Sequence, residues 1–135
     1  VALIMLGTND IGWVDPAAYE TNLRQIVQIS IDSGVIPVIS TIPDQLGTYG
    51  GGRVGQFNDI IRQVAVDYDI PLWDYWLAMQ PLPESGLGGD GIHPSYDPHT
   101  GETGLFAADG LRYGYNMRNL TALMVLDAVW RGALY

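Results

Sequence analysis

The sequence contains neither cysteine nor lysine. Without cysteine the chain has no disulfide, no thiolate nucleophile and no cysteine-ligated metal, and its redox compartment stays undetermined. All six basic residues are arginine, and they face 15 acidic residues, which gives a net charge of -9. Because so acidic a protein repels phosphate backbones, we expect no nucleic-acid partner.

Long apolar runs are also absent. None approaches the roughly 20 residues of a membrane-spanning helix, so no membrane span is expected. No signal peptide is visible, and the sequence starts within an apolar segment and not at a methionine. A length of 135 residues, with 47% hydrophobic and 16% charged residues, is typical of a globular protein. We therefore expect one domain over residues 1–135.

Apolar runs alternate with helical stripes. Strands are predicted at residues 1–6, 35–40 and 70–76. A first helix is predicted after Asp15, an N-cap followed by Pro16, and should end at Gly34. The stripe of a second helix consists of Phe57, Ile60, Ile61, Val64 and Ala65. A last helix is predicted over residues 117–131.

This order of elements predicts an α/β fold, a three-layer arrangement with a parallel sheet and right-handed crossovers. Residues 1–6 are apolar at every position, which predicts a strand that is buried on both faces. Because only three strands are predicted, we expect the sheet to be incomplete at its N-terminal side. The edge beside residues 1–6 is then prone to self-association with another chain.

Two polar stretches contain candidate catalytic groups. LGTNDIG places Gly7, Asn9 and Asp10 directly after the first strand, and GGDGIHPS places Asp90 and His93 after the third. Ligands of open α/β sheets bind outside the carboxyl ends of the strands. Since both stretches leave that edge, we expect them to meet in one cleft.

These residues can supply a general base and an oxyanion donor. Asp90 can fix one imidazole nitrogen of His93 and leave the other as a general base. Gly7 lets the backbone turn sharply, so the Asn9 amide can donate to a developing oxyanion. The plainer alternatives are that Asn9 and Asp10 only form a turn, and that Asp90 and His93 are a structural pair.

GTND at residues 7–10 and DGIHP at residues 90–94 resemble two conserved blocks of the SGNH hydrolases, also called GDSL-type esterases and lipases. The resemblance spans roughly residues 1–95 and implies the flavodoxin-like SGNH hydrolase fold, a three-layer α/β/α sandwich with a parallel sheet. It further implies that Asn9 is an oxyanion-hole donor on the turn with Gly7 and Asp10. In the same way it makes Asp90 and His93 the acid and base of a Ser-His-Asp triad.

The nucleophile of that family lies in a G-D-S block at the first strand, and the sequence contains no such block. None of the five serines has this context: Ser30, Ser33, Ser40, Ser85 and Ser95. Ser95 is near His93, but Pro94 intervenes and no strand-to-helix elbow presents its hydroxyl. Two interpretations follow: the chain is the carboxyl-terminal portion of a longer hydrolase, with the nucleophile outside this chain, or it is a relic without a nucleophile. The incomplete sheet favours the first.

The resemblance implies a hydrolase of carbohydrate or lipid-like esters that requires no cofactor, with a small-molecule or carbohydrate ester as its partner. The alternative is a non-catalytic binding module that retains the fold. Many members of the family are secreted, and the sequence itself leaves the compartment open.

Other motifs favour structural interpretations. GGGRVG at residues 50–55 matches G-x-G-x-x-G, but it is not a tight strand-to-helix turn, which favours a loop at the rim of the site over dinucleotide binding. Asn119–Thr121 is a glycosylation sequon inside a predicted helix.

Two further groups could bind ligands. Four side chains offer oxygen and nitrogen ligands, but their spacing favours a polar loop, and no metal site is predicted: Asp90, His93, Asp97 and His99. Trp73 and Tyr75 share one face of the third strand, where packing in the core is favoured over stacking on a sugar.

Overall fold

The computed structural model describes residues 1–47 and 52–134, of which residue 134 is described in its backbone alone. The chain forms two compact units. The first comprises Val1–Ile42 and Thr48–Asp74 and contains the sheet; the second comprises Pro43–Gly47 and Tyr75–Tyr135. Whether they make up one domain, as the sequence predicts, stays a prediction. In the part of the chain that is described, no helix has the length and apolar character to cross a membrane.

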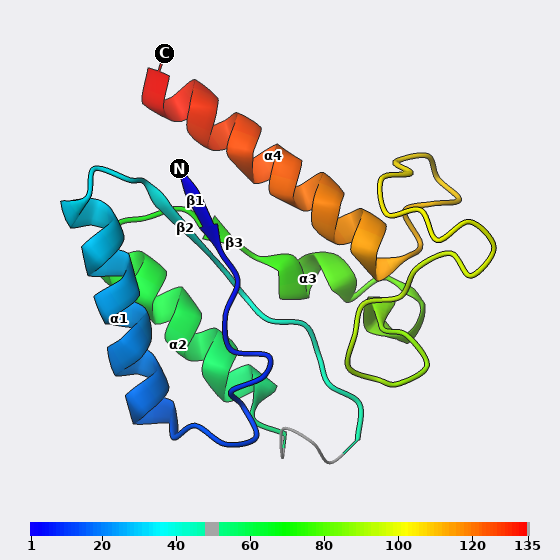
Figure 1. The fold of residues 1–135 in the computed structure, drawn as a ribbon, viewed down its shortest axis with the longest axis horizontal. Helices are drawn as coiled ribbons and strands as arrows, with labels where there is room; N and C mark the ends of the chain where they lie inside the picture. Colours follow the sequence, from blue (N-terminus) through cyan, green and yellow to red (C-terminus); the bar gives the residue numbers. More distant parts are fainter. Residues whose placement is uncertain (48–51, 135) are drawn as a thin grey trace. The chain divides into compact units, whose positions relative to one another are not determined.

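The sheet has three parallel strands in the order β1-β2-β3. They are β1 (Ala2–Ile4), β2 (Pro37–Ser40) and β3 (Leu72–Trp73). Leu3 lies opposite Val38, and Ile39 lies opposite Leu72. Figure 1 shows the strands side by side; along the chain, α1 (Pro16–Asp32) connects β1 to β2 and α2 (Val54–Asp67) connects β2 to β3. The predicted parallel α/β arrangement is confirmed.

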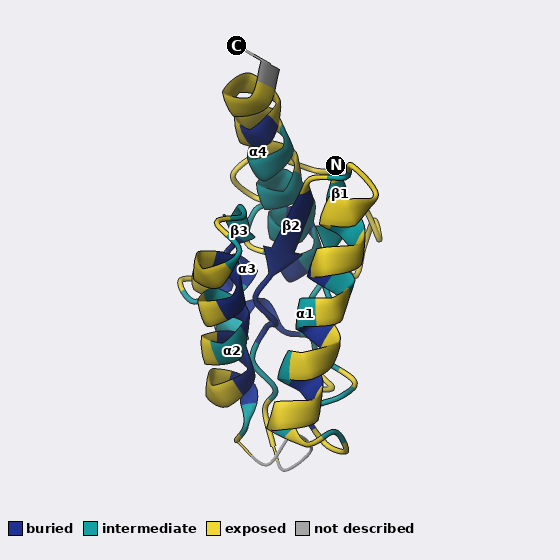
Figure 2. Ribbon diagram, turned by 90° about the vertical axis from the view of Figure 1, so that its left-hand side faces the viewer, coloured by how far each residue is buried: buried dark blue, intermediate teal, exposed yellow. Residues whose placement is uncertain are grey.

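The central strand of the sheet, β2, is the most buried. All four residues of β2 are buried (Figure 2). The expectation that residues 1–6 are buried on both faces is wrong, because β1 is half-buried and spans only Ala2–Ile4. Val1 is 62% exposed and Leu6 46%. Within residues 1–47 and 52–134, β1 has a strand neighbour on one side only, and an edge strand is covered less than a central one. Pairing of this edge with another chain stays a prediction.

Helices α1 and α2 pack against each other and against β2. The predicted start of α1 is confirmed, since the Asp15 carboxylate accepts a hydrogen bond from the Ala17 N–H at 2.9 Å. The predicted stop is confirmed as well, because Gly34 leaves the helix with φ +71. The two helices meet through the rings of Tyr19 and Phe57, whose centroids lie 4.4 Å apart.

The buried stripe of α2 also contains a polar residue, Asn58, which is 1% exposed. Its side chain accepts from the Ile42 N–H at 2.8 Å and donates to the Ile42 carbonyl at 3.0 Å. Both polar groups of the side chain are therefore satisfied. Asn58 holds the backbone directly beyond the carboxyl end of β2.

The predicted third strand is too long. β3 ends at Trp73, and Asp74 accepts a hydrogen bond from the Thr41 hydroxyl at 2.9 Å. Aspartate is unfavourable in strands, and the next residues form helix α3 (Tyr75–Met79). Trp73 and Tyr75 therefore do not share a strand face, although both are buried.

The second unit also contains a short 3-10 helix, η1 (Pro83–Gly86), and the long helix α4 (Gly114–Leu134). The last helix thus begins earlier and ends later than the predicted residues 117–131. Glycine at position 114 suggests a helix breaker, yet its N–H donates to the Ser95 hydroxyl at 3.0 Å. A residue distant in sequence therefore caps α4.

Candidate functional site

The turn that follows β1 is built around Gly7. The N–H groups of Asp10 and Ile11 donate to the Gly7 carbonyl at 2.9 and 3.1 Å. Gly7 has φ +120, and a Cβ at this position would lie 2.9 Å from the Tyr19 hydroxyl oxygen. Glycine is therefore required both by the backbone conformation and by the close approach of Tyr19. Asn9 lies on this turn and is exposed.

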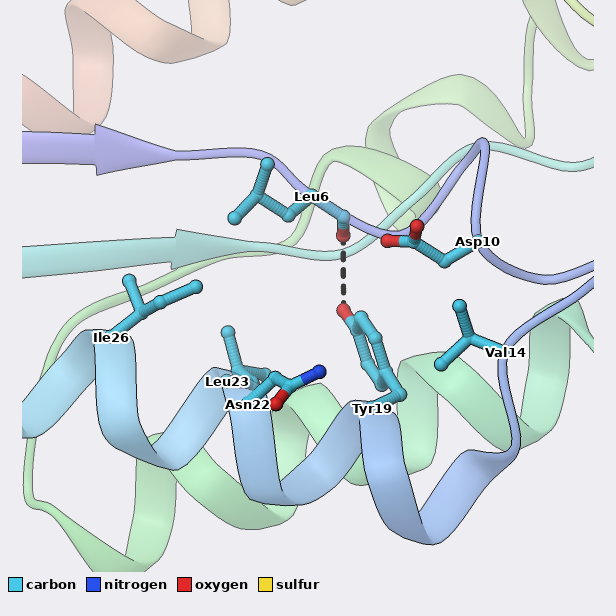
Figure 3. Close-up of a pocket in the computed structure, with 7 residues that line it drawn as sticks. All are labelled: Leu6, Asp10, Val14, Tyr19, Asn22, Leu23 and Ile26. Atoms are coloured by element: carbon cyan, nitrogen blue, oxygen red, sulfur yellow. Dashed lines mark hydrogen bonds between the residues drawn. The ribbon is translucent and has the colours of Figure 1, made fainter.

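Tyr19 supports the turn from α1. Its hydroxyl donates to the Leu6 carbonyl at 2.9 Å, as Figure 3 shows. Burial, with a smaller effect of the Asp10 charge, raises the pKa of Tyr19. The hydroxyl therefore stays protonated and keeps donating. A cavity of about 90 Å³ lies beside this contact and is lined by Leu6, Asp10, Val14, Tyr19, Asn22, Leu23 and Ile26.

Arg53 holds the backbone that follows the same turn. Its guanidinium donates to the carbonyls of Ile11 at 2.9 Å and Val14 at 2.6 Å. This arginine belongs to the G-x-G-x-x-G stretch, of which Gly50 and Gly51 lie outside the described residues. No sequence pattern indicates this contact, because the partners are 42 and 39 residues away.

Gly7→Ala should destabilise the first unit by about 1–3 kcal/mol, because alanine meets both the positive φ and the Tyr19 hydroxyl. Urea unfolding measures the loss. Gly55→Ala is the matched control, since Gly55 lies in α2, a Cβ there would have nothing within 4 Å, and alanine favours helix. Equal stabilities of the two variants would contradict the assigned role of Gly7.

Asp90 and His93 lie together as their spacing predicts. His93 Nδ1 is 2.7 Å from one Asp90 carboxylate oxygen. The other oxygen accepts from the N–H groups of Ile92 at 2.9 Å and His93 at 3.0 Å. A proton on Nδ1 is held by the carboxylate, so Nε2 presents its lone pair. The side chains are 70% exposed for His93 and 52% for Asp90, so both are accessible from solvent.

The hydrogen bonds also fix the charge of Asp90. The Ile92 N–H, then the His93 side chain and then the His93 N–H, lower the pKa of Asp90 to about 2. The carboxylate is therefore ionised at neutral pH. It can both hold the imidazole and stabilise an imidazolium.

We expect the Asp90 carboxyl group to titrate with a midpoint at about pH 2 in the folded chain and near 3.9 in urea. Because its pKa is lower in the folded state, Asp90 stabilises the fold above about pH 4, and this contribution is lost as the pH falls through about 2. Carbon-13 NMR of the carboxyl measures both midpoints. His93→Ala should retain part of the lowering, since the Ile92 N–H remains. A folded-state midpoint near 4 would refute the assigned contacts.

The loop that presents this pair is closed at its base. Leu87 and Pro94 form an antiparallel bridge, and the Gly88 N–H donates to the His93 carbonyl at 2.8 Å. Gly91 has φ +68, and its carbonyl accepts from the Leu46 N–H at 2.7 Å. An open depression of about 540 Å³ lies along the loop and is lined by Leu46, Gly47, Glu84, Gly88, Gly89, Asp90 and Gly91.

The other predicted ligand groups have local hydrogen bonds. Asp97 accepts from the His99 N–H at 2.9 Å, which is a turn within the loop. Over residues 1–47 and 52–134, no three His, Asp or Glu side chains gather around a common point for a metal ion. The sequon residue Asn119 lies inside α4, and its amide donates to the Thr103 carbonyl at 2.7 Å.

The serines of this chain are mostly committed to the backbone. Four of the five donate their hydroxyl to a carbonyl: Ser30, Ser33, Ser40 and Ser95. Ser40 is also buried, at 2% exposure. Ser95 donates to Gly86 at 3.0 Å, a partner that the sequence did not indicate. None of these four hydroxyls thus has the setting of an activated nucleophile.

Residues 1–99 match the GDSL-like Lipase/Acylhydrolase family. The chain belongs to this family. The match includes both motifs, from the Gly7–Asp10 turn to the pair of Asp90 and His93. No match was found among curated proteins.

Solved structures support the GDSL-like assignment at the level of the fold. A lipase/acylhydrolase from Enterococcus faecalis superposes with a TM-score of 0.67 at 21% identity, over 96% of this chain and 60% of that one. A GDSL-like lipase from Bacteroides thetaiotaomicron gives 0.67 at 15% identity, over 94% and 62%. A catalytic mutant of an acetylxylan esterase from Geobacillus stearothermophilus gives 0.65 at 17% identity, over 90% and 57%.

These likenesses confirm the predicted α/β/α sandwich of the GDSL-like family. The chain spans about 60% of the length of the structures it matches. Asn9 belongs to the first compact unit and His93 to the second. That the two share one cleft stays a prediction.

Proposed function

We propose that this chain supplies the acid, the base and an oxyanion donor of an ester hydrolase. The observation that supports the proposal best is the 2.7 Å contact between His93 Nδ1 and Asp90 on an exposed loop. This contact leaves Nε2 to act as a general base. Membership of the GDSL-like lipase/acylhydrolase family supports ester hydrolysis as the reaction.

In the proposed mechanism, a serine outside this chain attacks the ester carbonyl and gives its proton to His93 Nε2. Asp90 stabilises the imidazolium, and the Asn9 amide donates to the oxyanion. His93 then protonates the leaving alcohol, and water releases the acyl group in a second cycle of the same kind. None of these steps requires a cofactor.

We propose carbohydrate or lipid-like esters as the substrates. One structural neighbour is an acetylxylan esterase, which supports the carbohydrate class. The open depression beside Asp90 can accommodate a bulky alcohol, because four of its seven lining residues are glycines, which have no side chain to fill it.

The nucleophile assignment is tested with two forms of the protein. One is this chain alone, and the other, the serine-containing form, is this chain joined to the segment encoded upstream of Val1. We expect fluorophosphonate labelling and turnover of p-nitrophenyl acetate only in the serine-containing form, and loss of both when its upstream serine is replaced by alanine. Stoichiometric labelling of Ser95 in the chain alone would overturn the assignment. A serine-containing form without turnover would leave the non-catalytic binding module.

Asn9→Ala should lower kcat of the serine-containing form by about 10²- to 10³-fold with little change in KM, since an oxyanion donor acts mainly in the transition state. Steady-state kinetics measure the effect. Asn22→Ala, which removes an exposed asparagine from α1, is the control and should leave kcat unchanged. A loss of less than threefold at Asn9 would leave it as a turn former only.

A further inference from the structure

Ser95 lies where three segments of the second unit meet. Its N–H and its hydroxyl both donate to the Gly86 carbonyl, at 2.7 and 3.0 Å. Its hydroxyl oxygen accepts from the Gly114 N–H at 3.0 Å, and its carbonyl accepts from the Tyr115 N–H at 3.0 Å. One residue therefore joins the end of η1, the end of the loop with Asp90 and His93, and the start of α4.

The η1 end of this junction is strained. Glu84 and Ser85 have φ of 49 and 51, and Gly86 follows with φ +70. Three successive residues in the left-handed region persist only where neighbouring contacts hold them. The two hydrogen bonds from Ser95 to the Gly86 carbonyl are such contacts.

The α4 end is tightly packed. A Cβ at Gly114 would lie 2.8 Å from the Met79 methyl carbon and 3.0 Å from the Pro94 Cβ. The close approach lets the Ser95 hydroxyl reach the first N–H of the helix, which has no acceptor within α4. Hydrogen bonds to the start of α4 thus fix the position of Ser95.

The loop with Asp90 and His93 begins and ends next to Gly86 and Ser95. Leu87 directly follows Gly86, Pro94 directly precedes Ser95, and the two form the bridge that closes the loop. Both ends of the loop are therefore attached to the single contact between Gly86 and Ser95. A shift of Gly86 relative to Ser95 would therefore change the orientation of the His93 side chain.

We propose that Ser95 is a positioning residue, which fixes the Asp90–His93 pair by tying both ends of its loop to the start of α4. The inference rests on the proposed function, since it gives the serine nearest to His93 in the sequence a role in the reaction other than that of nucleophile. Its hydroxyl acts through His93 and touches no substrate.

The test compares Ser95→Ala with Ser95→Thr, which keeps the hydroxyl, and with Tyr75→Phe. The Tyr75 hydroxyl donates to the Gly114 carbonyl at 3.1 Å, so Tyr75→Phe removes a hydrogen bond from the same junction without changing Ser95. Two readouts are used: the midpoint of the Asp90 carboxyl titration in this chain, which needs no nucleophile, and kcat and KM of the serine-containing form. Urea unfolding reports stability for each variant.

Ser95→Ala should raise the Asp90 midpoint by about one pH unit towards the unfolded value and lower kcat at least tenfold, with a smaller effect on KM. Ser95→Thr should restore both, and Tyr75→Phe should destabilise the fold while leaving both unchanged. An unchanged midpoint in Ser95→Ala, or equal changes in Tyr75→Phe, would overturn the proposal.

If Ser95→Ala does not fold, Ser95→Cys takes its place, because a thiol is a weaker donor and acceptor. A partial rise of the midpoint supports the proposal, and an unchanged midpoint overturns it. Failure of the proposed function has a different signature: His93→Ala would then leave turnover intact, while the Asp90 midpoint would still respond to Ser95.

Discussion

His93→Ala should lower kcat of the serine-containing form by about 10⁴-fold or more, while KM changes little. In the proposed mechanism the imidazole takes the proton of the nucleophile and returns it to the leaving alcohol, so its loss would remove both proton transfers. Residual turnover should come from the oxyanion donors and from substrate binding alone. Single-turnover kinetics with an aryl ester separate this loss of chemistry from any effect on product release.

His99→Ala is the matched control for His93→Ala, because it removes the other histidine from the same unit. It should leave kcat within twofold of the parent protein. If both variants lose activity equally, the loss comes from the fold, and if neither does, His93 is not the base. Circular dichroism of both variants establishes that the fold is retained.

Asp90→Asn should lower kcat by about 10²- to 10⁴-fold. An asparagine oxygen can still accept from the N–H groups of Ile92 and His93, so the loop is expected to keep its shape. Its amide N–H₂ would then face Nδ1, which favours the tautomer with the proton on Nε2 and blocks the base. Kinetics against pH measure the loss, and the nitrogen-15 shifts of the imidazole report the tautomer.

Asp97→Asn is the control for Asp90→Asn. Asp97 also accepts a hydrogen bond from a backbone N–H two residues on, but its carboxylate does not bind His93. Its kcat should stay within twofold of the parent protein. Full activity of Asp90→Asn would reduce the Asp90–His93 contact to a structural pair.

The sequence predicted those features whose determinants are close together along the chain. Asp15 and Pro16 predicted the start of α1, and the three-residue spacing of Asp90 and His93 predicted their contact. The end of β3 was missed because five of the seven residues in 70–76 are apolar or aromatic, and the turn depends on Asp74, whose partner Thr41 is 33 residues away.

Contacts between residues distant in sequence also hold the candidate site, and these could not be predicted from the sequence. Arg53 and Ser95 show no sequence pattern, since each contacts backbone groups of segments distant in sequence. The burial of residues 1–6 was overestimated for a related reason. An apolar run shows that a strand can be buried, whereas the exposure of Val1 and Leu6 depends on which strands lie beside it.

The hydrogen bond from the Tyr19 hydroxyl to Leu6 has a consequence for motion. It links the turn with Asn9 to the first turns of α1, so the turn cannot open freely while the helix is docked. Local opening of α1 would release Leu6 and Gly7 together, which makes helix and turn one cooperative unit for hydrogen exchange. We therefore expect the amide protons of Asp10 and Ile11 to exchange on the timescale of α1 and not on that of an exposed loop.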